Sequence, residues 1–182
     1  MIGRLPTTLE IDGREYEIRS DFRVALLIFQ AYNDDELNMQ EKLTVCIECL
    51  YVDVPQDYQK AYEKAIWFLD GGDMPKPEKA PKKLMDWEQD ESIIFPAVNK
   101  VAGFETRTAE YLHWWSFLGL FNEVGEGLYS SVMNIRAKKA KRKKLEKWET
   151  EFYNNHKELV DLKHKLTAEE QEELDFINSL IG

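Results

Sequence analysis

The sequence has no long apolar run and no leader-like start. No stretch reaches the roughly 20 apolar residues that a membrane-spanning helix needs, and the N-terminus, Met1–Pro6, does not lead into the apolar region of a signal peptide. We therefore expect a cytoplasmic protein without a membrane partner.

Catalytic motifs are missing too. We find no glycine-rich phosphate loop, HExxH, GxSxG or EF-hand pattern. The many acidic residues are scattered over expected polar helix faces. His113 lies between aromatic residues, which favours a hydrogen-bonded core or interface histidine over a catalytic base. We expect no enzyme, no catalytic residue and no cofactor.

Cysteine is scarce. Cys46 and Cys49 are the only two, three positions apart in a segment that reads as helix. No second cysteine pair and no suitably spaced histidine completes a zinc site, and redox CxxC pairs usually sit at a helix start. We interpret both as free thiols on one helical face, with no metal.

Positive charge is also in deficit, with 24 basic against 34 acidic residues and a formal net charge of −10. This balance argues against non-specific binding of nucleic acid or of an anionic membrane. Hydrophobic residues make up 43% and aromatics 12% of the 182 residues, enough for a true core.

The N-terminal part of the sequence has the pattern of a β-hairpin. Apolar and polar residues alternate on both sides of Asp12-Gly13, a dipeptide typical of two-residue hairpin turns. We expect Leu9 and Ile11 to pair with Tyr16 and Ile18. An isolated hairpin is marginally stable, so it should pack on a helix.

Helical periodicity dominates the rest. Ser20 or Asp21 should cap the first helix, and Asn38 with Glu41 should form a capping box at the start of the second. Pro55 should lie in the first turn of the third helix. We expect a fourth helix to start near Asp86, and Thr106 or Thr108 to cap the helix that contains the two adjacent tryptophans. Gly71-Gly72 should end the third helix, and a mobile linker should follow at about 73–84. Pro96 predicts a kink or break.

The segment 112–121, Leu-His-Trp-Trp-Ser-Phe-Leu-Gly-Leu-Phe, contains two adjacent tryptophans and two phenylalanines within ten residues. As a helix it has no polar face, because successive residues step about 100° around the axis. The rest of the domain or a partner must cover it. We expect at least one of Trp114 and Trp115 in the core, and both are candidate partner or self-association residues.

From Leu128 to Ile181 there is no proline or glycine, which predicts a long C-terminal helix and a short final helix after Thr167. The apolar residues Leu145, Trp148 and Phe152 complete the candidate partner or self-association set. The expected fold is mostly α: an N-terminal β-hairpin packed on a helical bundle over residues 1–127, and an interaction appendage over 128–182.

The basic run from Lys138 to Lys144 has three interpretations. The favoured one is a solvated helix face balanced by nearby acidic residues. The others are phosphate contacts with nucleic acid and docking to an acidic partner or neighbouring subunit. Its candidate charge contacts are Lys139, Arg142 and Lys143.

Three segments together resemble a known family: 11–23, with its Ser-Asp-Phe-Arg end, 68–72, Phe-Leu-Asp-Gly-Gly, and 112–117, with His-Trp-Trp. In this order they are similar to a phage family called "Gp fifteen", from long-tailed phages and prophages of Gram-positive bacteria. Pro96 and the segment 104–107 depart from the family pattern.

The resemblance implies a helical, non-enzymatic tail assembly chaperone in the cytoplasm of the bacterial host. It would bind the tape measure protein before the tail tube polymerises. Separately, the apolar side of the expected long C-terminal helix predicts pairing with another subunit or with a client, so a homo-oligomer is a further expectation. One alternative is a structural head–tail connector or tail completion protein. A second is a nucleic-acid-binding regulator acting through Lys138–Lys144.

Overall fold

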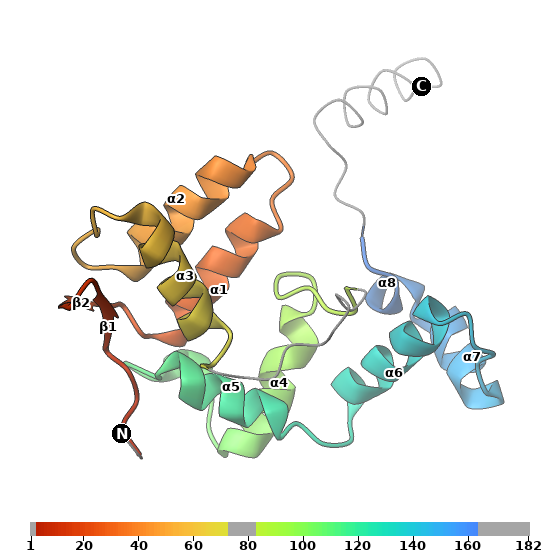
Figure 1. The fold of residues 1–182 in the computed structure, drawn as a ribbon. Coiled ribbons are helices and arrows are strands. Elements are labelled where there is room, and N and C mark those ends of the chain that lie inside the picture. The colour runs from red at the N-terminus through yellow and green to blue at the C-terminus, as the bar shows by residue number, and fades with distance from the viewer. Residues whose placement is uncertain (1–2, 73–82, 164–182) are drawn as a thin grey trace, which may run out of the picture.

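A computed structural model describes residues 3–72 and 83–163 of the chain (Figure 1). It is mostly helical, with one N-terminal two-stranded hairpin, as the sequence predicts. The elements are β1 (Thr8–Ile11), β2 (Arg14–Glu17), α1 (Phe22–Tyr32), α2 (Met39–Leu50), α3 (Tyr58–Leu69), α4 (Glu91–Ala102), the 3-10 helix η1 (Thr106–Thr108), α5 (Trp114–Asn122), α6 (Leu128–Ala140), α7 (Lys147–Asn155) and α8 (Lys157–Val160). Most of the expected linker and the expected helix after Thr167 lie outside the described residues.

The hairpin turns at Asp12-Gly13, as predicted. Both residues have positive φ, 51° and 77°, which is the backbone of a two-residue turn with the twist that hairpin strands need. Leu9 pairs with Tyr16. Ile18 lies beyond β2 and forms an isolated bridge to Tyr51 at the end of α2, so the hairpin is tied to the helices.

The first two helices begin where their capping residues predict. The Asp21 side chain accepts a hydrogen bond from the backbone N–H of Arg23, and Asn38 and Glu41 form a reciprocal capping box. The third start is different. Asp57 caps α3, so Pro55 lies before the helix and not in its first turn.

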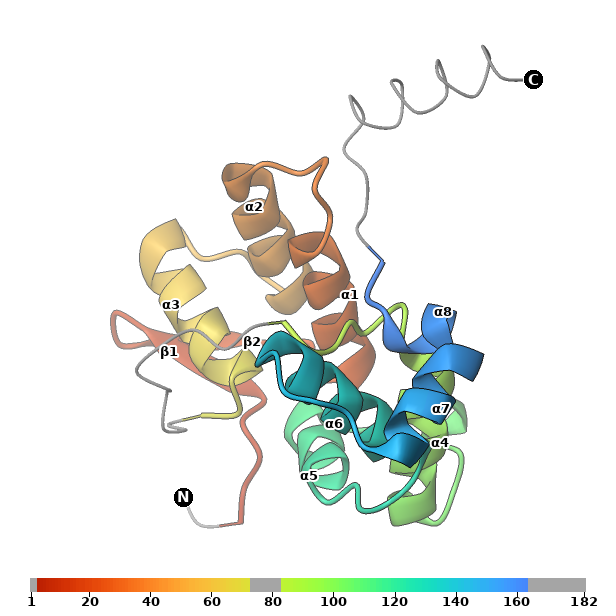
Figure 2. The ribbon, with the colours of Figure 1, turned by 90° about the vertical axis from the view of Figure 1, so that its right-hand side faces the viewer.

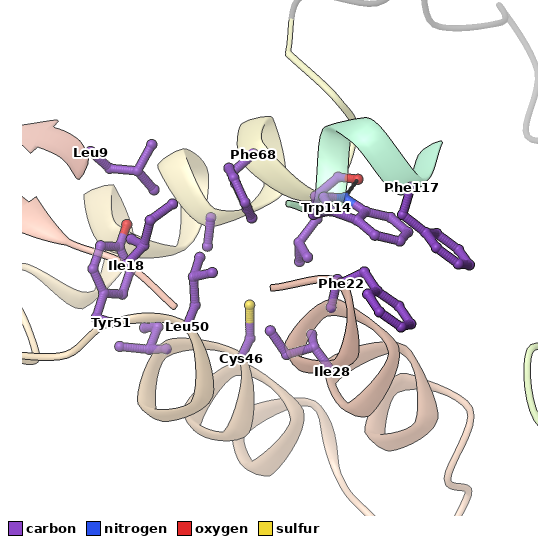
Figure 3. Close-up of a cluster of buried hydrophobic side chains, with 14 of the residues drawn as sticks. Leu9, Ile18, Phe22, Ile28, Cys46, Leu50, Tyr51, Phe68, Trp114 and Phe117 are labelled. Atoms are coloured by element: carbon purple, nitrogen blue, oxygen red, sulfur yellow. Dashed lines mark hydrogen bonds between the residues drawn. The ribbon is translucent and has the colours of Figure 1, made fainter. Parts of the chain in front are cut away.

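The larger of two hydrophobic cores lies where α1, α2, α3 and α5 meet (Figure 3). Phe22 of α1 stacks on Phe117 of α5 with ring centroids 4.6 Å apart, and Trp114 lies beside them. Cys46 of α2 is also fully buried in this core. The core therefore joins segments nearly 100 residues apart in sequence.

The start of α5 differs from the prediction. Thr106–Thr108 forms a separate 3-10 turn, and α5 begins only at Trp114, with His113 as its N-cap. The imidazole Nδ1 of His113 accepts the backbone N–H of Trp115 at 3.0 Å. A histidine ring nitrogen is therefore the N-cap acceptor of α5, a role in which Ser, Thr or Asp side chains are more usual.

The expected break at Pro96 does not occur, and α4 continues through it. Proline has no N–H, so position 96 cannot donate the usual helix hydrogen bond to the carbonyl of Ser92. Both Ser92 and Pro96 are on the exposed side of the helix. The missing hydrogen bond therefore falls where water can replace it.

The predicted long C-terminal helix is wrong. The chain leaves α6 after Ala140, turns at Arg142 with a left-handed φ of 53°, and returns as α7 and the short α8 (Figure 2). A second, smaller core forms as a result. It consists of Ile93 from α4 with Val132, Ile135 and Val160.

Candidate interaction site

The candidate partner residues fall into very different surroundings. Trp114 is buried, Trp115, Leu145 and Phe152 are half-buried against the cores, and Trp148 is 51% exposed. Phe152 stacks on the ring of His156. Of the five, Trp148 is the side chain most available to a partner.

The two adjacent tryptophans bind adjacent carbonyls at the end of α3. The indole N–H of Trp114 donates to Leu69 at 2.9 Å, and that of Trp115 donates to Phe68 at 2.8 Å. The last carbonyls of a helix lack partners within it, so the indoles satisfy them. Gly72 makes room, because a Cβ there would lie 3.1 Å from the Trp115 ring.

A second connection joins the start of α1 to the segment before α5. The backbone N–H of Phe22 donates to the carbonyl of Leu112, and that of Trp114 donates to the carbonyl of Ser20. The Asp21 carboxylate also accepts the Leu112 N–H. The segments 11–23, 68–72 and 112–117 thus converge on one structural centre, and the contacts there are those of packing and capping.

His113 at this centre is held neutral. Its Nε2–H donates to the carbonyl of Pro6 at 2.9 Å while Nδ1 accepts from Trp115. Burial lowers the pKa of His113, and the bond to Pro6 offsets this only in part. A second proton would remove the acceptor that caps α5.

Acidification should therefore destabilise the protein through His113. As the pH falls below the ordinary histidine pKa of 6.5, the unfolded chain takes up a proton that the folded chain does not, so the free energy of unfolding falls until the pH passes the lower folded-state pKa. His113→Asn keeps a capping oxygen without titrating. Urea unfolding over this pH range should show a smaller loss for the variant, and identical slopes would contradict the assignment.

A buried ion pair, which the sequence did not reveal, links α4 and α6. The guanidinium of Arg136 binds both carboxylate oxygens of Asp90 at 2.6 and 2.8 Å, and the two side chains are 5% and 0% exposed. Its N–H groups also donate to the carbonyls of Leu84, Leu159 and Val160. One side chain thus joins four parts of the chain.

Two lysines of the basic run are already engaged. Lys138 binds Glu149, which is 2% exposed, at 2.6 Å. Lys139 binds Asp161 and lies 3.6 Å from the centre of the Tyr153 ring. Burial opposes the charge of Lys139, but the hydrogen bonds to Asp161 and Tyr153 outweigh it and raise its pKa.

The basic turn, which we define as Lys141–Lys144, is by contrast exposed throughout. It includes the candidate residues Arg142 and Lys143. Within residues 3–72 and 83–163, no carboxylate forms an ion pair with these four side chains. Arg142 and Lys143 therefore remain available for a charged partner, whereas Lys139 serves the fold.

A further surface, which the sequence did not predict, is an apolar groove between α4 and the connection from α5 to α6. It has a volume of about 440 Å³, within the range typical of binding pockets. Val101 and Leu128 on its walls are 38% and 49% exposed. Its lining is Ser92, Ile93, Pro96, Ala97, Lys100, Val101 and residues 123–129.

In the part of the chain that the structure describes, no group of His, Cys, Asp and Glu side chains has the arrangement of a metal site. No described helix is both long enough and apolar enough to cross a bilayer.

A family model described as Bacteriophage Gp15 protein matches residues 1–162. The chain belongs to this phage family. Membership in the Gp15 family supports a structural or assembly role in the phage. The match covers every described helix and both cores. No curated protein and no solved structure matches the chain.

Proposed function

We propose that the protein is a non-enzymatic phage tail assembly chaperone that binds the tape measure protein. Membership in the Gp15 family carries the proposal, together with the resemblance to tail assembly chaperones. The apolar groove supports it, because a chaperone for an amphipathic helix needs an apolar channel on a soluble body. The net charge of −10 favours solubility while apolar surface is displayed.

The walls of the groove suit an apolar helical stripe. Ile93, Pro96 and Ala97 of α4 form one side and Val124 and Leu128 the other. Charged residues border this apolar lining, Lys100 from α4 and Glu123 and Glu126 from the connection. Helix-in-groove recognition combines an apolar floor with a polar edge in this way.

Binding should fail when the groove is charged. In the double variant Val101→Asp/Leu128→Asp, docking an apolar stripe would bury two carboxylates, which costs several kcal/mol. We expect the affinity of the variant for the tape measure protein of the same phage to fall at least tenfold. Co-expression of the two proteins, followed by measurement of soluble tape measure protein, tests this.

Met39→Asp is the matched control, because Met39 is 75% exposed and lies on α2. It should bind like the wild type. Equal binding by the groove variant would assign the contact to another surface. Mass spectrometry of purified particles separates the alternatives, since a connector or completion protein stays in the virion and an assembly chaperone does not.

A further inference from the structure

We propose that the basic turn, Lys141–Lys144, together with Trp148, is the docking site of the acidic C-terminal segment, residues 164–182, of the same chain. This contact is independent of the proposed function. It rests on three observations: the unpaired charge of the turn, the composition of the segment, and the point at which the segment leaves the described fold.

The receiving surface combines cations with an aromatic face. A shallow groove of about 380 Å³ runs between the end of α6 and the start of α7, lined by Asn134, Ala137, Lys138, Lys141, Lys143, Glu146, Trp148 and Glu149. Lys138 is engaged by Glu149, which leaves Lys141 and Lys143 facing the groove without a described carboxylate. The half-exposed indole of Trp148 supplies apolar area beside them.

The segment 164–182 has the complementary composition. Five carboxylates lie within the seven residues 169–175, and the apolar residues Leu174, Phe176 and Ile177 lie among and after them. Carboxylates that meet lysine and arginine form charge-assisted hydrogen bonds. An apolar side chain can pack on the Trp148 ring at the same time, so the segment matches both features of the surface.

The segment begins three residues after Asp161, which is bound to both α6 and α7. Asp161 is held by Lys139, near the end of α6 and two residues before Lys141, and by the Tyr153 hydroxyl of α7. The backbone N–H of Lys163 donates to Gln89. Six chain steps from Lys163 to Glu169 span roughly 20 Å when extended. Short tethers give effective concentrations of about millimolar, which favours the same chain over a second copy.

Carbodiimide cross-linking of the full-length protein tests this contact, since it joins only carboxylates and amines in direct contact. We expect peptide mapping to find bonds from residues 169–175 to the lysines of the basic turn. In a mixture of ¹⁵N-labelled and unlabelled protein, each bond should join peptides of one label. The yield should fall severalfold at high salt, which screens exposed charges.

The matched variants are Lys141→Glu/Lys143→Glu/Lys144→Glu and, as control, Lys64→Glu on the exposed face of α3. Lys138 lines the same groove, so it should also form bonds to residues 169–175, and only the triple variant should lose these bonds, because the segment no longer docks. Bonds between differently labelled copies would overturn the proposal, as would an unchanged yield of bonds from Lys138 to residues 169–175.

Fluorescence gives a second, independent measurement. Acrylamide should quench Trp148 more strongly when the acidic residues 169, 170, 172 and 173 are changed to glutamine, because the ring is then uncovered. Subtracting the signal of Trp148→Phe isolates this tryptophan from the other four. Equal quenching of the glutamine variant and the wild type would overturn the contact.

Discussion

Replacing Arg136 with methionine is expected to lower the free energy of unfolding by about 3–5 kcal/mol. The substitution leaves the Asp90 carboxylate fully buried without its partner and removes the donors to Leu84, Leu159 and Val160. An uncompensated buried charge is among the most destabilising changes a protein can undergo. Urea unfolding followed by circular dichroism measures the effect.

Arg107→Met is the matched control, because Arg107 pairs with Glu105 and Glu91 on the surface, with its side chain 47% exposed. It should unfold almost like the wild type. The double variant Arg136→Met/Asp90→Leu removes both charges and should recover part of the loss. A small effect of Arg136→Met alone would show that the pair contributes little to the fold.

Trp114→Ala is expected to cost about 3–5 kcal/mol, the range for truncating a large buried aromatic side chain. Trp114 is 1% exposed, contacts the rings of Phe29, Trp87 and Phe117, and satisfies the Leu69 carbonyl. For a chain of this size the loss corresponds to a fall in melting temperature of roughly 6–20 °C. Differential scanning calorimetry reports it.

Trp148→Ala changes the same residue type at a half-exposed site and should melt close to the wild type. Trp115→Ala should lie between the two, since Trp115 is half-buried but binds the Phe68 carbonyl. If Trp114→Ala and Trp148→Ala melted alike, the placement of Trp114 in the core would be contradicted.

Features that depend on neighbouring residues were predictable from the sequence. The Asp12-Gly13 turn and the capping box of Asn38 and Glu41 form within a few residues, and the structure confirms both. Periodicity likewise placed the first helix and the need to cover the Trp-Trp segment. In these places the local chemistry alone decides the conformation.

Features that depend on distant residues were not predictable. Arg136 comes just before the basic run Lys138–Lys144, but it follows Val132 by four positions and so shares the apolar stripe of α6. That spacing was the available indication that it points inward. Its partner Asp90 is 46 residues away, and nothing local marks the pairing.

The end of α6 was missed for a related reason. Left-handed residues at helix ends are usually glycine or asparagine, and here the residue is Arg142. After the turn, contacts between distant residues hold the returning chain: Lys138 binds Glu149 of α7, Arg136 binds the carbonyl of Val160 in α8, and Lys139 binds Asp161 just after α8. The groove at Val101 and Leu128 likewise exists only once α4 and α6 are packed together.

The indole of Trp114 donates a hydrogen bond to the carbonyl of Leu69, which is 45 residues earlier in the chain. This distance in sequence matters while the protein is being translated. Ribosomes add about 5–20 residues per second, so α1–α3 spend several seconds outside the tunnel before the aromatic residues of α5 can arrive. During that interval Phe22, Ile28 and Phe68 lack part of their final cover. Aggregation during translation should therefore rise when elongation is slowed after α3 has left the tunnel and before α5 has left it, and much less when it is slowed later.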